Sequence, residues 1–260
     1  MLINEKLILE KIKDNDTLSY IFHFLEEDEE VRNLLITANI NSTERLHYND
    51  HGIKHSRIVS GASLEILERL VKANILPSVV INRIGTIEDS KIVVLIASYL
   101  HDVGMCIHRN FHHFFSTIIS SKIVEKILSD IYSDTRKRIL IRNEILNAIF
   151  SHDESINAIT IEAGIVKIAD GLDMAEGRAR IPHKLGKSDI HAFSALAIKS
   201  VEVESVENYP ILIRVNMENE SGIFQIEKVL AEKIKTSPIK NYVKVIAIKN
   251  GIELKSYTFF

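Results

Sequence analysis

The spacing of apolar residues changes once along this chain, near residue 190. Before that point, Ile, Leu, Val and Phe recur about every three or four residues, which is the period of amphipathic helices. Beyond it, the chain consists of short segments rich in Ile and Val, as β-strands are, with one amphipathic helix expected among them over residues 221–234. We therefore expect a mainly α fold. A helical bundle over residues 1–188, with a helical extension at 1–45, would precede a small α+β domain over residues 189–260 that serves dimerisation or regulation.

Composition excludes several classes of protein. Of the 260 residues, 46% are hydrophobic and 26% are charged, and the net charge is −3, which fits a globular protein and argues against an extended nucleic-acid surface. The single cysteine, Cys106, allows no intramolecular disulfide and fits a reducing compartment. No apolar run approaches the roughly 20 residues of a membrane span, and the N-terminus lacks the apolar core of a signal peptide. We expect a cytoplasmic homodimer without a membrane partner.

The most apolar of the expected helices, roughly residues 90–103, ends in the adjacent pair His101-Asp102. Neutral imidazole and carboxylate are common ligands of divalent transition metals, although a buried, hydrogen-bonded His–Asp pair would also explain both residues. The segment Thr86-Ile-Glu-Asp89 predicts a capping box at the start of this helix. Gly104 is expected to end it in a left-handed conformation.

Further potential ligands stand near the ends of other expected helices. One helix is expected to begin near Asn49, so that His51 and His55, four residues apart, share one of its faces. Another is expected over residues 116–128. In a helical bundle, side chains from several helix ends can converge on one pocket and bind metal. A single histidine is more often structural, but the combination predicts a site. The candidates are His55, His101, Asp102, His112, His152 and Asp170.

The order and context of these residues resemble the HD-domain metal-dependent phosphohydrolases. That family has an early His, an adjacent His-Asp pair and a late Asp in a helical domain. The matching segments here are His55-Ser-Arg-Ile-Val, Tyr99-Leu-His-Asp-Val-Gly and Lys167-Ile-Ala-Asp-Gly-Leu-Asp. His112 and His152 are similar to two further histidines of the family's two-metal branch. The resemblance covers about residues 47–180 and leaves the C-terminal region uncovered.

The resemblance implies one or two divalent ions, with Mn, Fe, Zn, Co, Ni or Mg as candidates. The implied metal ligands are His55, His101, Asp102, His112, His152 and Asp170. Asp102 would bridge two ions and take part in catalysis. In such sites a metal-activated hydroxide attacks phosphorus. The implied substrate is a small phosphomonoester or phosphodiester, with a nucleotide as the expected class.

The segment Tyr48-Asn-Asp-His-Gly-Ile-Lys-His55 also resembles the cyclic-nucleotide phosphodiesterases of the same superfamily. By that resemblance His51 is a catalytic general acid and His55 a metal ligand. A zinc-protease motif would need Glu directly after the first His, where this chain has Gly52. The alternative for His51 is a histidine that faces solvent at the start of a helix.

Cations near these segments are candidates for binding the phosphate of a substrate, since arginine in particular grips phosphate through two hydrogen bonds. They are Lys54, Arg109, Arg178 and Arg180. A basic segment after a helix, favoured by the helix dipole, would explain the two later arginines equally well.

The roles of several neighbouring residues stay open. Asp153, Asp173 and His108 either orient ligands or lie on the surface. Of the adjacent His112 and His113, we expect only His112 to face a metal. Three aromatic residues are expected in the core: Phe111, Phe114 and Phe115. Two other functions remain possible, namely an HD-type di-iron oxygenase and a regulatory module that keeps the metal site to sense a ligand.

Overall fold

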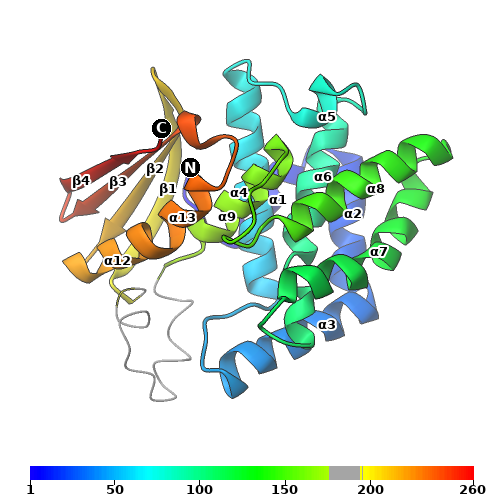
Figure 1. Ribbon diagram of the computed structural model, residues 1–260, viewed down its shortest axis with the longest axis horizontal. Coiled ribbons are helices and arrows are strands. Elements are labelled where there is room, and N and C mark those ends of the chain that lie inside the picture. Colours follow the sequence, from blue (N-terminus) through cyan, green and yellow to red (C-terminus); the bar gives the residue numbers. More distant parts are fainter. Residues whose placement is uncertain (176–193, 195) are drawn as a thin grey trace.

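The computed structural model describes residues 1–175, 194 and 196–260. A thick layer of helices packs on one side of a four-stranded sheet (Figure 1). The prediction of a mainly α fold is confirmed, although the sheet means that the chain is not all α. Among the described residues, no helix combines the length and the apolar character needed to cross a bilayer.

The helical layer is arranged around α6. Every residue from Ile92 to Leu100 in this helix is buried, and the helix packs against α4, α8 and α9. A helix that is apolar on all sides is suited to such a central place. In chain order the layer contains α1 (Leu7–Ile12), α2 (Asp16–Glu27), α3 (Glu29–Asn39), α4 (Ile53–Lys72), α5 (Ser78–Ile81), α6 (Ile87–Leu100), α7 (His112–Ile131), α8 (Thr135–Phe150) and α9 (Ile161–Leu172).

The predicted capping box at the start of α6 is present. The Thr86 hydroxyl accepts a hydrogen bond from the Asp89 N–H at 3.3 Å, and Asp89 Oδ2 accepts one from the Thr86 N–H at 2.7 Å. Asp89 also accepts a hydrogen bond from the Tyr132 hydroxyl and pairs with Lys137 at 3.0 Å. A single buried carboxylate therefore joins α6 to α7 and α8.

We expect Asp89→Asn to lower the free energy of unfolding by about 2 kcal/mol at neutral pH, because hydrogen bonds to a charged group and a helix cap are lost together. Burial raises the pKa of Asp89, but Tyr132, Thr86 and Lys137 lower it further, so the net shift is downward. A carboxyl with a depressed pKa stabilises the fold above its unfolded-state pKa of about 3.9 and loses this contribution as the pH falls through its folded-state pKa. Urea unfolding of both proteins should therefore show a difference at pH 7 that shrinks below about pH 4. An unchanged difference at acid pH would contradict the role of the charge.

The start of α4 differs from the prediction. The helix begins at Ile53, and Gly52 is extended with φ −98° and ψ −160°, so His51 lies outside the helix. Asp50 Oδ1 accepts a hydrogen bond from the Gly52 N–H at 2.8 Å. Asp and Asn side chains commonly bind the chain in this way at turns, in competition with helix formation. The expectation that His51 and His55 share one helical face is wrong for this reason.

Gly104 is not left-handed, contrary to the prediction. It lies in a 3₁₀ turn, η2 (Val103–Cys106), and among the described glycines Gly251 is the one with positive φ. The reason for a glycine here is space. A Cβ on Gly104 would lie 2.2 Å from the carbonyl oxygen of His112 and 2.4 Å from the nitrogen of Ser116. Helix α7 also begins at His112 rather than at Ser116, directly after Phe111 in the left-handed conformation with φ 63°.

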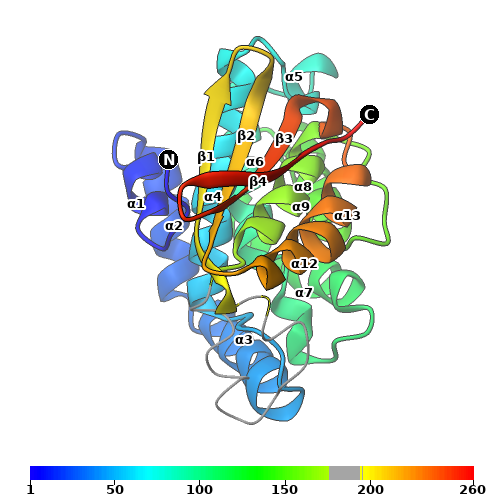
Figure 2. The same cartoon turned by 90° about the vertical axis from the view of Figure 1, so that its left-hand side faces the viewer.

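The sheet has the order β1-β2-β3-β4, and Figure 2 shows it from its open side. Strands β1 and β2 are antiparallel, β2 and β3 are parallel, and β3 and β4 are antiparallel. The parallel pair requires a crossover. It contains the helix predicted over residues 221–234, which is helical without a break from 220 to 235 and has a π-helical turn, η5, between α12 and α13. The bounds are β1 (Ile198–Val206), β2 (Tyr209–Met217), α12 (Ile223–Gln225), η5 (Ile226–Leu230), α13 (Ala231–Lys235), β3 (Val243–Lys249) and β4 (Ile252–Thr258).

The sheet and the helices share one hydrophobic core. Its buried residues run continuously from the helical layer into β1, β2 and β3, and the crossover packs on α9. The N-terminus also joins the sheet, because the Ile3 N–H donates to the Val201 carbonyl at 2.9 Å and the Val203 N–H donates to that of Met1 at 2.8 Å. The predicted boundary at 188–189 lies outside the described residues.

Candidate metal centre

Four histidines from different parts of the helical layer meet at one buried point. His55 comes from the first turn of α4, His101 follows α6, His112 begins α7, and His152 follows α8. Their side chains are at most 5% exposed. The Nε2 atoms of His55 and His101 are 3.2 Å apart, and those of His112 and His152 are 3.0 Å apart. The centre therefore contains two histidine pairs.

The other nitrogen of each ring is tied to an oxygen. Nδ1 of His101 lies 2.7 Å from the Ser98 carbonyl oxygen, and Nδ1 of His152 lies 2.6 Å from that of Ile149. These carbonyls lie in the last turns of α6 and α8, which leave such groups free. Likewise, Nδ1 of His112 lies 3.0 Å from the Arg109 carbonyl oxygen. A carbonyl can only accept, so Nδ1 is the donor in each ring.

The pair His112 and His152 is suited to bind a cation. Burial lowers the pKa of His112 to about 3, and burial also lowers the pKa of His152. Both rings are then neutral near pH 7, with the proton on Nδ1. Two Nε2 lone pairs 3.0 Å apart face each other without a proton between them. Neutral imidazole nitrogens arranged in this way fit a divalent metal ion, which accepts both lone pairs.

Asp102 lies between the two pairs and is 2% exposed. Its Oδ2 is 3.2 Å from Nε2 of His101 and 3.4 Å from that of His55. Its Oδ1 is 3.4 Å from Nε2 of His112 and 3.6 Å from that of His152. One carboxylate thus offers a separate oxygen to each histidine pair, the geometry that a ligand shared by two ions requires.

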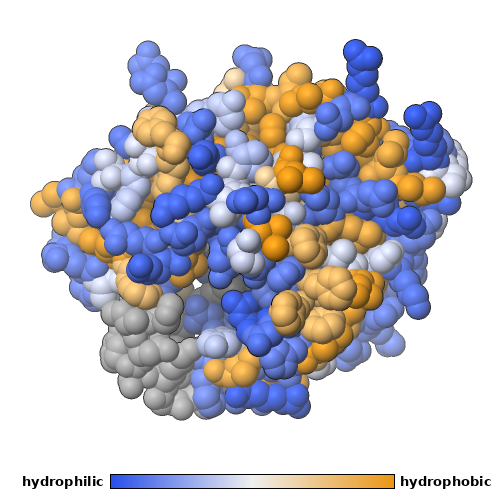
Figure 3. All heavy atoms as spheres, viewed as in Figure 1, coloured by the Kyte–Doolittle hydropathy of each residue, from blue (hydrophilic) through white to orange (hydrophobic). Residues whose placement is uncertain are grey.

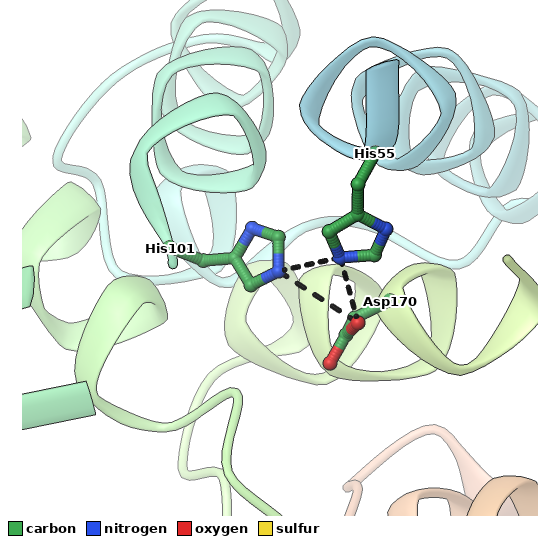
Figure 4. Close-up of side chains that lie close together, drawn as sticks. All are labelled: His55, His101 and Asp170. Carbon is green, nitrogen blue, oxygen red and sulfur yellow. Dashed lines mark hydrogen bonds and ion pairs between the residues drawn. The ribbon is translucent and has the colours of Figure 1, made fainter. Parts of the chain in front are cut away.

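Asp170, from the last turn of α9, faces only the first pair. Its Oδ1 lies 3.2 Å from Nε2 of His55 and 3.7 Å from that of His101 (Figure 4). Burial raises the pKa of Asp170, but Lys233 and the two imidazoles outweigh it and hold this pKa well below its usual range. Burial likewise opposes ionisation of Asp102, yet the charges of His101 and His51 keep its pKa well below normal. Two carboxylates are therefore ionised in the interior.

Positive charge is correspondingly favoured beside these carboxylates. Burial lowers the pKa of His101, but Asp102 and Asp170 raise it to about 9. In the absence of a metal, a proton would thus occupy the Nε2 of His101 near neutral pH. A divalent ion at the same place would supply that charge and release the proton.

His51 lies beside this centre without belonging to a histidine pair. Its Nδ1 is 2.6 Å from the Asn49 carbonyl oxygen and 2.9 Å from the Ser42 hydroxyl, while its Nε2 is 4.0 Å from Asp102 Oδ2. The side chain is 14% exposed. The ring is therefore held by Nδ1 with Nε2 toward the centre, although it stands before α4 rather than on it.

The predicted phosphate-binding cations lie in different surroundings, and two of them fall outside the described residues. Nη1 of Arg109 lies 3.1 Å from Nδ1 and 3.3 Å from Nε2 of His112, so the guanidinium covers the face of that ring. Lys54 is exposed on the first turn of α4, and its side chain makes no hydrogen bond or ion pair within the described residues. Arg178 and Arg180 lie outside the described residues.

Asp173, which the sequence left open, lies next to a candidate ligand. It is 8% exposed, and its Oδ2 accepts a hydrogen bond from Nδ1 of His55 at 2.7 Å. A carboxylate in this place fixes the tautomer and orientation of a metal-binding imidazole. His113 is turned elsewhere, with Nδ1 3.6 Å from Asp153 Oδ2. His113 and Asp153 form a separate cluster with His112, whose Nδ1 is already bound to a carbonyl oxygen.

Two expectations about the surroundings need correction. Phe111 is 68% exposed and Phe114 is 49% exposed, so they are not core residues. The buried face of α7 contains His112, Ser116 and Ser120, which turns both rings outward. Apolar atoms gather over this part of α7 in Figure 3.

Sequence reasoning missed Lys233, whose Nζ lies 2.8 Å from Asp170 Oδ2. The sequence contains only a weak indication that Lys233 is buried. Lys233 follows Leu230 by three residues and Ile226 by seven, on the apolar side of the expected helix.

The region that contains the centre matches a known protein family. A family model described as HD domain matches residues 52–175, the segment that carries every candidate ligand. The chain is 44% identical over 227 residues to Uncharacterized protein MJ1020 of Methanocaldococcus jannaschii, a match that covers 87% of each chain. No solved structure matches the chain.

Proposed function

Because the chain belongs to the HD-domain family, whose members are in general metal-dependent phosphohydrolases, we propose that it hydrolyses a small phosphomonoester or phosphodiester. A nucleotide is the substrate class we favour. The observation that carries the proposal is Asp102, whose two oxygens face two different histidine pairs. This arrangement supports a centre of two metal ions, which is suited to phosphoryl transfer to water.

The residues divide into two sets of ligands. His55, His101, Asp170 Oδ1 and Asp102 Oδ2 would hold one ion. His112, His152 and Asp102 Oδ1 would hold the other. Nitrogen and oxygen ligands without cysteine favour Mn, Fe, Zn, Co or Ni over an ion that prefers oxygen alone, such as Mg. When bound, the ions acidify water and neutralise charge on the phosphoryl oxygens.

The protein's own groups would do the remaining work. The carbonyl oxygen of Asn49 holds the His51 ring through Nδ1, so the Nε2 of His51 can deliver a proton to the leaving oxygen. Arg109 covers His112 and is available to bind a phosphate oxygen from the side of the second ion. Asp173 keeps the lone pair of His55 directed at the first ion. The predicted homodimer and the regulatory role of the sheet region remain predictions.

The proposal is tested by metal analysis of protein purified without a chelator, followed by assays of nucleotides and p-nitrophenyl phosphates with added Mn²⁺. We expect bound divalent metal and turnover of at least one phosphate ester. A mixed-valence iron pair without phosphatase activity would favour the di-iron oxygenase instead. Bound metal without any chemical turnover, combined with tight binding of a nucleotide, would favour the ligand-sensing module.

His51→Ala should keep its metal and lose turnover by about 10²–10⁴-fold, the usual contribution of a general acid. The reason is that His51 lies 4.0 Å from Asp102 and outside both histidine pairs. Metal content and kcat would be measured together. His23→Ala, at an exposed position on α2, is the matched control and should change neither. Loss of metal in His51→Ala would assign this residue to the ligands instead.

A further inference from the structure

Lys233 on α13 reaches both halves of the candidate centre from the crossover that packs on α9. Its Nζ lies 2.8 Å from Asp170 Oδ2 and donates to the His152 carbonyl oxygen at 3.0 Å. The residue is only 6% exposed. Asp170 belongs to the first set of ligands and His152 to the second. One ammonium group therefore connects the two sets.

We propose that Lys233 is a positioning residue that fixes Asp170 and His152 relative to each other, so that the sheet region completes the metal centre. This inference rests on the proposed function, because it assumes that these two residues bind metal. It gives the C-terminal region a part in building the site, beyond the dimerisation or regulation expected from the sequence.

The two carboxylates of the centre differ because of this lysine. Both oxygens of Asp102 face imidazole nitrogens. Asp170 has only Oδ1 toward His55, while Oδ2 is held by Lys233. With Oδ2 occupied by an ammonium group, Asp170 can offer one oxygen to one ion. Lys233 thereby restricts Asp170 to a terminal ligand and leaves Asp102 as the bridge.

The lysine stem passes over α9 at a glycine. A Cβ on Gly171 would lie 3.2 Å from Lys233 Cδ and 3.0 Å from Leu230 Cδ1. Both contacts are closer than ordinary van der Waals distance, so a side chain at 171 would shift the stem and the Leu230 side chain by a few tenths of an ångström. Gly171 directly follows Asp170 in the sequence, and the space it leaves allows the ammonium to reach that carboxylate.

The alternative is that Lys233 only forms an ion pair that joins the crossover to α9 and has no effect on the metal ligands. A buried ammonium is costly unless charged and polar partners surround it. Here they are Asp170, the His152 carbonyl and, at 3.8 Å, Glu154 Oε2. Two of these three partners are, or belong to, proposed ligands. If the role were only to join the layers, its removal would change stability and leave metal affinity alone.

The experiment compares Mn²⁺ and Co²⁺ binding by calorimetry in full-length wild type, Lys233→Met and Lys235→Met. We expect Lys233→Met to weaken metal binding by about 10–100-fold, as loss of a residue that orients a ligand does. Its Co²⁺ absorption spectrum should also change, because Asp170 becomes free to bind through both oxygens. Lys235 is exposed and pairs with Glu232 on the same helix, so Lys235→Met should bind like wild type.

A folded Lys233→Met with wild-type affinity and spectrum would overturn the inference. If this variant does not fold, Gly171→Ala decides, since it displaces the stem without removing the ammonium. We expect a smaller loss of affinity in Gly171→Ala, and an unchanged affinity would again overturn the inference. Wild type that binds metal but hydrolyses no phosphate ester would contradict the proposed function alone. Wild type that binds no metal would overturn both.

Discussion

Asp102→Ala is expected to lose both metal ions and all detectable turnover. Asp102 is the one residue in the described centre whose two oxygens face both histidine pairs, at distances of 3.2–3.6 Å. Without it the first ion would keep three ligands and the second only two histidines. The two pairs would also lose the negative charge between them, and this charge favours a cation at the centre.

The measurement is the metal content after gel filtration, alongside the rate with a phosphate ester. His152→Ala is an informative comparison, because it removes a ligand from one set only and should leave the first ion bound. Asp14→Ala is the matched control, since Asp14 is an exposed carboxylate that pairs with Lys13 and belongs to neither set of ligands. Retention of full metal content in Asp102→Ala would rule out the bridging role, and retention of one ion would reduce Asp102 to a ligand of the other.

The candidate site could be predicted as a set of residues but not as a geometry. The order of His55, His101-Asp102 and Asp170 is a local pattern, because each stands near a helix end that the sequence marks. The distances between them depend on how three helices, α4, α6 and α9, pack together, which no local pattern encodes. The division of the Asp102 oxygens between two histidine pairs appears only in the folded structure.

Lys233 shows why the rest of the site could not be predicted from the sequence. It is separated from Asp170 by 63 positions and comes from a segment with a different structural pattern. A lysine on an apolar helix face is usually explained by its long stem, which lets the charge reach water. Only the packing of the crossover on α9 shows that this charge stays buried.

The fold was predictable where local chemistry dominates. The capping box of Thr86 and Asp89 marks the start of α6, and both its hydrogen bonds are present. The predicted position of His51 on α4 was wrong, because the Asp50 side chain accepts a hydrogen bond from the Gly52 N–H and the chain stays extended up to Gly52. Helix periodicity alone cannot distinguish a residue in the first turn from one just before it.

Gly104→Ala is expected to destabilise the protein by about 3 kcal/mol or more, at the upper end of overpacking effects, and to lose the second ion. The new Cβ would lie 2.2 Å from the His112 carbonyl oxygen and 2.4 Å from the Ser116 nitrogen. Both are backbone atoms of α7, so no side-chain rotation can relieve the contact. The start of α7 has to move away, and His112 moves with it. The pair of His112 and His152, now 3.0 Å apart, would then open while His55 and His101 keep their places.

Ser116→Ala separates this steric effect from the loss of a hydrogen bond. The Ser116 hydroxyl accepts a hydrogen bond from the Gly104 N–H at 2.8 Å, and its removal should cost only about 1 kcal/mol while both ions stay bound. Thermal unfolding and metal content of the two variants give the comparison. Equal losses in Gly104→Ala and Ser116→Ala would show that the hydrogen bond matters more than the space. A Gly104→Ala protein with two ions and wild-type stability would mean that α7 can shift without carrying His112 out of the centre. If Gly104→Ala instead loses only one ion, the lack of a Cβ at position 104 is what lets His112 bind the second ion.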